Sequence, residues 1–247
     1  MAQNQEKIDM HALIESMSRP QGRFDCTGMH KADKAYFIAR LYRQAHLPLV
    51  IITPSPKEAR RFCDELGFFL GSEAAVIHYS PPYNLLPYQF LTSNSETAAE
   101  RIRILYNLVV NQSPQIVVTT IDAVLKKTLP RKALCDYAEL ILCNEDVDRE
   151  RLVGKLESGG YMHTAIVEEP GDYCVRGGIV DIFSPLYSRP LRIEMFGDLV
   201  ESLRFFSAAN QRTEEQIQEA IILPAKEAIL DPSQLRSVIG RIREEAA

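Results

Sequence analysis

The polar stretch at residues 19–34, ahead of an apolar stretch with helical spacing at 35–42, is the first place where this chain could do chemistry. A loop that binds nucleotide phosphates before a helix requires the pattern G-x-x-x-x-G-K-[ST]. Its backbone amides surround the phosphates, its lysine reaches the β- and γ-oxygens, and its hydroxyl holds magnesium. No segment of the chain matches this pattern. The residues by themselves therefore do not predict a nucleotide site.

Paired acidic residues are a second candidate for chemistry. Asp172 could act with Asp181, and Glu168 adjoins Glu169. Catalysis by paired carboxylates requires other groups that converge on the same point. No histidine, nucleophilic serine or metal-ligand spacing accompanies these residues. Solvated strand ends are therefore the better interpretation.

Arg176 precedes the pair Gly177-Gly178, which predicts a β-bulge that re-aims the strand. Its guanidinium could anchor a carboxylate of another protein, because arginine forms paired, charge-assisted hydrogen bonds. The alternative is a local salt bridge to a carboxylate of the same segment: Glu168, Glu169 or Asp172.

Aromatic residues leave two alternatives open. Tyr83, Tyr88 and Phe90 could stack on nucleic-acid bases, but no dense Lys/Arg cluster accompanies them, so packing is favoured. Alternation alone places Phe183 equally well in a core or at an interface.

The cysteines and histidines argue against a metal site. Five cysteines lack any C-x-x-C pair, and five histidines lack ligand spacing. We expect free, mostly buried thiols. No uncharged run approaches the roughly 18 residues that a membrane helix needs, and no signal-peptide pattern is present, so the cytoplasm is the expected location.

Charge narrows the class of partner. The chain carries a net charge of −5, and residues 139–205 hold seven Lys/Arg against thirteen Asp/Glu. An acidic surface repels phosphate backbones and gains nothing from counterion release. Nucleic acid is therefore a poor candidate partner for this segment.

The first half of the chain alternates helical and β-branched stretches. Strands are expected at 47–53, 74–79 and 115–120, and helices at 7–18, 35–42, 56–70, 95–111 and 121–129. Ser55 and Ser95 are the expected N-caps of two of these helices. This order predicts a parallel sheet covered by helices, with nearly apolar strands buried on both faces.

The second half changes character. A strand is expected at 140–142 and a helix at 148–158, capped by Asp146 or Asp148. Apolar-rich runs at 165–168, 173–183, 191–196 and 199–206 are separated by Pro and Gly turn signals, which predicts a β-meander of three or four antiparallel strands. A short helix is expected at 214–220, and a charged helix at 232–245 whose abrupt end suggests a longer protein.

The meander also carries a family resemblance. Residues 173–183 (YCVRGGIVDIF), 192–198 (RIEMFGD) and 201–204 (ESLR) resemble the UvrA-binding domain that UvrB shares with the transcription–repair coupling factors. Further stretches at 85–88, 95–102, 116–120 and 211–213 resemble the coupling factors. One departure from UvrB is Cys174, where UvrB has a second arginine.

The resemblance also concerns the polar stretch at residues 19–34. Residues 27–32 (TGMHKA) fall where UvrB has a phosphate loop. By that comparison Asp25 and His30 replace glycines and Ala32 removes the magnesium hydroxyl, whereas Thr27, Gly28 and Lys31 remain. The resemblance therefore implies a degenerate, inactive loop in a P-loop-derived parallel sheet.

The resemblance also implies an architecture and a function. The expected fold is α/β, with a degenerate P-loop domain at 1–126 plus 207–247 and an inserted UvrA-binding α+β domain at 127–206. The implied function is a non-catalytic adaptor, without cofactor or metal, that binds UvrA. The implied contact residues are Arg176, Phe183, Tyr173 and Asp181. RNA polymerase and DNA would be bound through regions absent from this chain. The alternative is a UvrB-type, ATP-dependent protein that binds damaged DNA.

Overall fold

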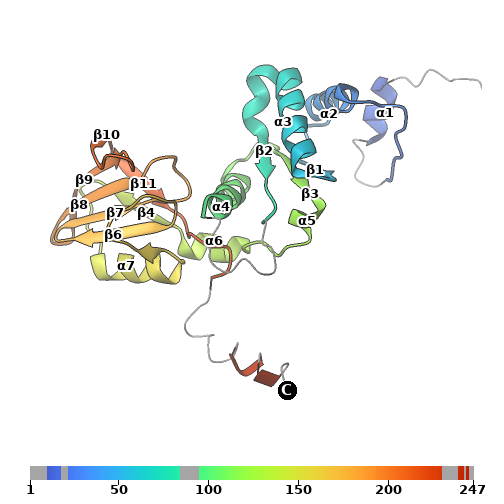
Figure 1. The fold of residues 1–247 in the computed structure, drawn as a ribbon. Coiled ribbons are helices and arrows are strands. Elements are labelled where there is room, and N and C mark those ends of the chain that lie inside the picture. Colours follow the sequence, from blue (N-terminus) through green and yellow to red (C-terminus); the bar gives the residue numbers. More distant parts are fainter. Residues whose placement is uncertain (1–9, 18–21, 84–94, 230–238, 242, 245–247) are drawn as a thin grey trace, which may run out of the picture. The chain divides into compact units, whose positions relative to one another are not determined.

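The computed structural model describes residues 10–17, 22–83, 95–229, 239–241 and 243–244 (Figure 1). The chain divides into two compact units, one of residues 1–82 with 110–126 and one of residues 83–109 with 127–247. Tyr88, Phe90, the resembling stretch 85–88 and most of the expected helix at 232–245 lie outside the described residues.

The first unit contains a three-stranded parallel sheet in the order β1 (Leu49–Thr53), β3 (Ile116–Thr120), β2 (Ile77–Ser80). Helices α2 (Ala32–Ala45) and α3 (Pro56–Leu70) pack against one face of it. The remaining elements of this unit are α1 (Met10–Met17), the 3-10 helix η1 (Gly71–Val76) and α5 (Ile121–Val124). The predicted parallel sheet is thus confirmed, as is the cap of α3, where the Ser55 hydroxyl accepts a hydrogen bond from the Glu58 N–H.

The opposite face of β1 departs from the prediction. Val50 and Ile52 are 67% and 52% exposed, so β1 is not buried on both faces. Side chains alternate along a strand, and these two point away from the face on which α2 and α3 pack. The strand expected at 74–79 is also shorter, because residues 74–76 belong to η1.

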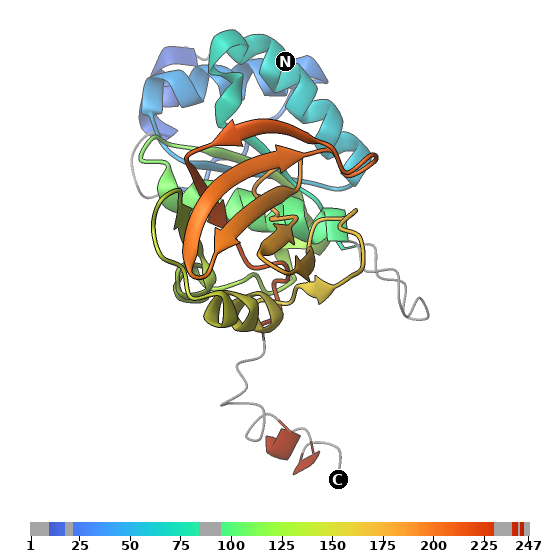
Figure 2. The same ribbon diagram turned by 90° about the vertical axis from the view of Figure 1, so that its left-hand side faces the viewer.

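The second unit is organised by a six-stranded sheet in the order β10-β9-β8-β7-β6-β5. Strands β6 to β9 pair antiparallel with their chain neighbours, which confirms the predicted meander. The predicted run 173–183 forms two of these strands, however, and the run 165–168 forms none. The strands twist against one another (Figure 2). Their bounds are β5 Met162–His163, β6 Asp172–Arg176, β7 Ile179–Ile182, β8 Leu191–Phe196, β9 Leu199–Phe206 and β10 Thr213–Ile217.

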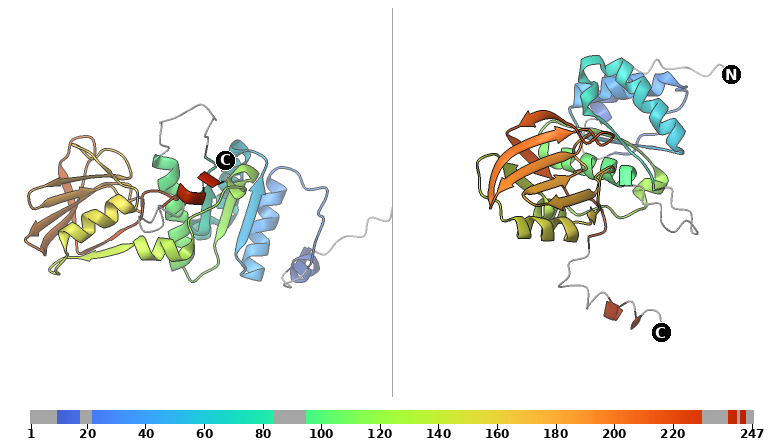
Figure 3. Two further views of the ribbon diagram at one scale, coloured as in Figure 1. Left: turned by 90° about the horizontal axis from the view of Figure 1, so that it is seen from below. Right: turned by 60° about the vertical axis from the view of Figure 1, so that its left-hand side comes forward.

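Helix α7 (Arg149–Ser158) covers one face of this sheet (Figure 3). Leu152 and Leu156 are 2% exposed and belong to the same core cluster as Ile193 and Leu203 of the sheet. The Asp148 carboxylate accepts a hydrogen bond from the Arg151 N–H (2.9 Å). Of the two predicted caps, Asp148 is therefore the one that the structure selects.

Further elements surround this core. Strands β4 (Glu139–Leu142) and β11 (Glu219–Ile222) pair antiparallel, and helices α4 (Ser95–Val110) and α6 (Arg131–Tyr137) share a second cluster with Leu223. Ser95, an expected N-cap, is the first residue of α4, and its hydroxyl donates to Glu169 (2.8 Å). A buried ion pair between Arg101 and Glu227 (2.9 Å) joins α4 to the segment after β11.

Residues 207–229 correct two expectations. The segment 214–220 is not a helix, because Thr213–Ile217 pairs with β9 and Glu219–Ile222 pairs with β4. Pairing with existing strands outweighs the helix propensity of a Glu- and Gln-rich stretch. Both pairings also place this segment in the second unit, which includes residues 83–109 as well as 127–206, so the units differ from the expected grouping of 1–126 with 207–247.

The Gly177-Gly178 pair forms a hairpin turn and not the expected bulge, since Arg176 pairs directly with Ile179 across it. Gly177 has a φ of 61°, which glycine adopts without strain. The Gly178 carbonyl accepts a hydrogen bond from the Met195 N–H (2.7 Å), so β8 lies against the turn.

All five cysteines are free, but only Cys174 is buried, which corrects the expectation of mostly buried thiols. Within the described part of the chain, no helix has the length and apolar character needed to cross a bilayer.

The close approach at Gly178 leads to a stability prediction. A Cβ at this position would press on the Met195 carbonyl oxygen, which is backbone and cannot move without shifting β8. We expect Gly178→Ala to lower the free energy of unfolding by about 1–3 kcal/mol. Urea unfolding followed by circular dichroism measures the change.

Gly154→Ala is the matched control. Gly154 lies inside α7, and nothing lies within 4 Å of a Cβ built there. Alanine is favoured over glycine in a helix interior, so this variant should gain about 0.5–1 kcal/mol. A Gly178→Ala protein as stable as the parent would contradict the packing described here.

Candidate protein-binding surface

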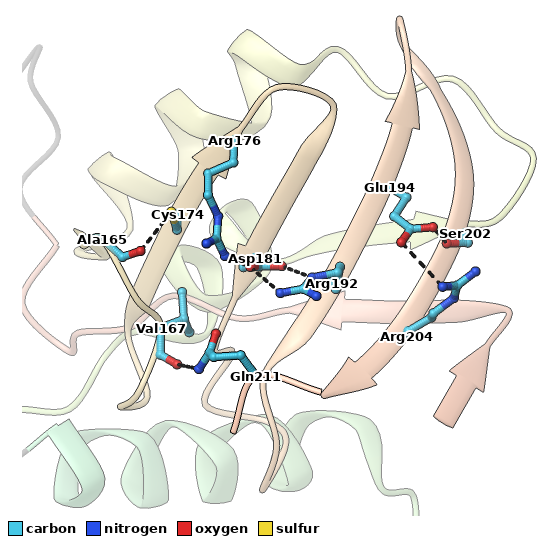
Figure 4. A network of polar contacts seen from close by, with 10 residues as sticks. All are labelled: Ala165, Val167, Cys174, Arg176, Asp181, Arg192, Glu194, Ser202, Arg204 and Gln211. Carbon is cyan, nitrogen blue, oxygen red and sulfur yellow. Dashed lines mark hydrogen bonds and ion pairs between the residues drawn. The ribbon is translucent and has the colours of Figure 1, made fainter. Parts of the chain in front are cut away.

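The second face of the six-stranded sheet, opposite α7, is polar and we call it the polar face (Figure 4). It is built by alternation, because neighbouring residues on a strand point to opposite sides. Val180 and Ile193 point into the core beneath α7, whereas their neighbours Asp181 and Arg192 point outward. The charged residues of this face are Arg176, Asp181, Arg192, Glu194 and Arg204.

Asp181 is the centre of the polar face. Its carboxylate receives two hydrogen bonds from Arg192, Nε to Oδ1 (2.7 Å) and Nη2 to Oδ2 (2.9 Å). Arg176 Nη2 donates to the same Oδ2 (2.7 Å). The Asp181 side chain is only 1% exposed. Its burial is tolerable because two charge-assisted partners replace water.

The two arginines differ in their accessibility. The Arg192 side chain is 16% exposed, and its guanidinium lies 4.7 Å from the centre of the Phe206 ring. Hydrogen bonds from Arg192 to Asp181 raise the pKa of Arg192, so it is always charged. The Arg176 side chain is 52% exposed. With two cations and one anion, this cluster has a net positive charge inside an acidic segment, and Arg176 presents it to solvent.

A second cluster adjoins the first on β8 and β9. Glu194 accepts hydrogen bonds from the Ser202 hydroxyl (2.6 Å) and from Arg204 Nη1 (3.4 Å). The side chains of Glu194 and Arg204 are each about one-third exposed. This cluster is electrically balanced and offers both donors and acceptors.

Phe196 is a surface residue that the sequence analysis did not single out. It ends β8 and is 76% exposed. Met195 points into the core, so Phe196 points the other way, to the same side as Arg192 and Glu194. The motif RIEMFGD contains it, and its alternation with Met195 was the signal that could have identified it.

The structure places the four predicted contact residues in different environments. Arg176 is exposed on the polar face, and Asp181 is buried directly beneath it. Phe183 is 7% exposed and packs with Val167 and Phe206. Phe183 therefore supports the polar face from within, which corrects the expectation that it is an exposed interface aromatic.

Tyr173 lies on the other side of the sheet. It is 2% exposed, and its hydroxyl donates to Glu157 Oε1 (2.8 Å). Burial and the contact with Glu157 raise the pKa of Tyr173 to about 12. Tyr173 is thus a core residue beside α7, and the expectation that it shares a contact surface with Arg176 is corrected.

Local contacts explain the remaining residues of the motif. The alternative considered for Arg176, a local salt bridge, does form, but its partner is Asp181 and not Glu168, Glu169 or Asp172. Asp172 instead accepts from the backbone N–H groups of Glu168 (3.1 Å) and Glu169 (3.0 Å). Cys174 is 4% exposed, and its thiol contacts the Ala165 carbonyl. The carboxylates of both Asp172 and Asp181 thus accept local hydrogen bonds.

The predicted inactive phosphate loop precedes α2 in the first unit. Gly28 has a φ of 83° and Lys31 a φ of 47°, and no side chain caps the helix at Lys31. The His30 N–H donates to the Asp33 carboxylate (3.2 Å), so an acidic group occupies the first turn. Asp25 adds a second exposed carboxylate to the loop, paired with Arg23 (3.6 Å). The absence of a hydroxyl at Ala32 does not fit a magnesium–triphosphate group.

The structure also bears on metal binding and on base stacking. Among the residues that it describes, no three or more His, Cys, Asp or Glu side chains are grouped in a way that could hold a metal ion. Tyr83, one of the aromatics considered for base stacking, lies with its ring 5.1 Å from the Arg101 guanidinium, beside the buried ion pair with Glu227.

The buried Phe183 and the exposed Phe196 allow a contrasting stability test. Phe183→Ala should lower the free energy of unfolding by about 3–5 kcal/mol, because it leaves a cavity between Val167 and Phe206. Phe196→Ala should change it by less than about 0.5 kcal/mol, because the ring is already in water. Urea unfolding of both variants tests the assignment, and equal losses would contradict it.

The segment that carries the polar face resembles a known protein family. Residues 141–227 match the UvrB interaction domain. Transcription-repair-coupling factors are similar over most of the chain: that of Myxococcus xanthus is 31% identical over 89% of this chain, that of Bacillus subtilis 26% over 96%, and one of Staphylococcus aureus 28% over 89%. The chain spans 18% to 20% of the length of these relatives. Residues 141–227 are therefore a UvrB interaction domain, within a chain that is homologous to the transcription-repair-coupling factors over nearly its whole length.

Proposed function

We propose that this chain is a non-catalytic adaptor that binds UvrA through the polar face and so brings excision repair to stalled transcription. The observation that carries the proposal is the exposed, ion-paired guanidinium of Arg176 on the matched domain. The name of the matched family concerns an interaction, and the named relatives couple transcription to repair. Contacts with RNA polymerase and DNA are proposed for the parts of the relatives that this chain does not span.

The geometry of the polar face suits docking of an acidic protein surface. Asp181 holds Arg176 in place before binding, which reduces the side-chain entropy lost on association. Arg176 pairs with Asp181 through Nη2, so its other N–H groups can donate to a partner carboxylate while it stays in place. Phe196 adds an exposed aromatic ring, a residue type that is enriched at the centre of interfaces.

The first unit has a supporting role in this proposal. Its parallel sheet with α2 and α3 on one face is compatible with descent from a phosphate-loop fold that has lost its catalytic residues. The motif changes at Asp25, His30 and Ala32 favour the adaptor over the UvrB-type, ATP-dependent alternative.

Binding to UvrA tests the polar face directly. Arg176→Ala and Phe196→Ala should each weaken binding of purified UvrA by about 1–3 kcal/mol, or roughly 5- to 150-fold. Isothermal titration calorimetry or a quantitative pull-down measures the change. Both variants should keep the unfolding profile of the parent, because Arg192 still pairs with Asp181 and Phe196 is exposed.

Arg189→Ala is the matched control. Arg189 also forms ion pairs, with Glu214 and Glu215, and also lies over a ring, that of Phe205. Phe205 belongs to the core cluster beneath α7, so this arginine is not part of the polar face. Unchanged UvrA binding by Arg176→Ala and Phe196→Ala, or an equal loss in Arg189→Ala, would refute the proposed surface.

Nucleotide binding separates the adaptor from the enzyme. Calorimetry with MgATP should detect no binding, because Asp25 and His30 stand where the phosphate-loop motif needs glycine and Ala32 offers magnesium no hydroxyl. Tight, magnesium-dependent binding that Lys31→Ala abolishes would establish the ATP-dependent alternative instead.

A further inference from the structure

A cleft of about 630 Å³ lies on the side of the six-stranded sheet opposite the polar face. Helix α7 forms one wall, with Glu150, Val153, Gly154 and Glu157, and strands β5 and β6 form the other. The strand residues that line it are His163, Tyr173 and Val175. These side chains alternate with Cys174 and Arg176, so the cleft is distinct from the polar face.

The cleft runs along an open backbone edge of β6. Strand β5 pairs parallel with β6 only at Asp172 and Tyr173. In the same register Ala165 would face Val175, but the chain turns away after the Thr164 N–H donates to the Tyr173 carbonyl (2.9 Å). It then crosses to the other face, where Val167 packs with Cys174.

The position of Val175 in the ladder shows where its backbone groups point. In antiparallel pairs, residues that exchange hydrogen bonds alternate with residues that point away from the partner strand. The Phe183 N–H donates to the Asp172 carbonyl, so Cys174 and Arg176 bond to β7, whereas Tyr173 and Val175 point outward. Tyr173 is paired with β5, and no described residue pairs with the outward N–H and C=O of Val175.

The neighbouring outward group is already bonded. The Gly177 carbonyl accepts a hydrogen bond from Arg149 Nη1 (2.8 Å). The open edge is therefore short and centred on Val175, which suits a few residues of an extended peptide and not a long strand.

The lining of the cleft determines which side chain fits beside Val175. Val153 and Gly154 provide an apolar, unobstructed wall, since nothing lies within 4 Å of a Cβ built on Gly154. Glu150 and Glu157 provide carboxylates, and the one lining guanidinium, Arg149, is bonded to Gly177. An arginine or lysine can lay its aliphatic stem on the apolar wall and bring its charge to the carboxylates.

An adjoining hollow of about 340 Å³ strengthens the charge argument. It shares Arg149 and Glu150 with the cleft and adds the carboxylates of Asp148 and Asp198. The lining of this hollow carries three carboxylates and one guanidinium, a net negative charge that favours a basic peptide over an acidic one.

We propose that this cleft binds an extended, basic peptide segment of a partner protein, which adds to β6 beside Val175 and places an arginine or lysine between α7 and the sheet. The peptide continues the direction of β5 beyond Thr164, at the point where the chain turns away from β6. Its backbone pairs with the N–H and C=O of Val175. The proposal is independent of UvrA binding by the polar face.

The experiment uses a fluorescein-labelled peptide, Ala-Val-Arg-Val-Ala with an amidated C-terminus, and the whole chain labelled with 15N. Titration should shift the amide resonance of Val175 and slow its hydrogen exchange. A peptide with Glu at the centre should bind at least about tenfold more weakly, because the carboxylates repel it. A peptide N-methylated at the fourth residue, which lacks the donor for the Val175 carbonyl, should lose about tenfold as well.

Protein variants locate the binding. Gly154→Leu fills the cleft from an exposed helix position and should weaken the arginine peptide at least about tenfold, and Glu150→Lys should weaken it about fivefold or more. Arg176→Ala, on the polar face, should leave peptide binding unchanged while it weakens UvrA binding. The proposal is overturned if the Val175 amide does not respond to millimolar peptide, if the N-methylated peptide binds equally, or if Gly154→Leu binds like the parent.

Discussion

The buried carboxylate of Asp181 is the interaction on which the polar face depends. A carboxylate that is 1% exposed loses nearly all of its hydration, and such a loss is tolerated only when fixed donors replace the water. Arg192 does so with two hydrogen bonds and stacks on Phe206, which fixes β7, β8 and β9 against one another. Arg176 completes the set from the hairpin of β6 and β7.

Arg192 and Arg176 both pair with Asp181 but have different roles. Arg192 is mostly covered and satisfies the charge of Asp181, so it is part of the fold. Arg176 is half exposed and is held by the same carboxylate, so it reaches solvent in a fixed position. A guanidinium that is already ordered loses little entropy when it meets a partner. The fold thus holds the Arg176 guanidinium at the surface, while Arg192 keeps the buried carboxylate of Asp181 paired.

The alternation of the strands gives the sheet two different surfaces. One face packs on α7 through Val180, Ile193 and Leu203, and near its margin the departure of β5 leaves the cleft beside Val175. The other face carries the charged clusters and rests on Phe183 and Phe206. Neighbouring residues on a strand point in opposite directions, so one sheet can carry two unlike surfaces. Here these are the polar face with the exposed Arg176 and the acidic cleft beside Val175.

Local sequence patterns determined much of this protein. The parallel sheet of the first unit, the meander and the start of α3 at Ser55 follow from periodicity, capping residues and turn residues, which act over a few positions. For α7 these patterns left Asp146 and Asp148 as alternative caps, and the structure has Asp148. The motif around Arg176 likewise marked the domain that the family comparison identifies. Tertiary structure alone decided that residues 213–217 form a strand and not a helix, since their pairing partner, β9, fixes them. It also decided that Phe183 and Tyr173 are buried on opposite faces, that Phe196 is exposed, and that Asp181 joins two arginines from different strands. These outcomes depend on contacts between segments distant in the chain, and local sequence patterns do not encode which of several apolar or charged residues will meet.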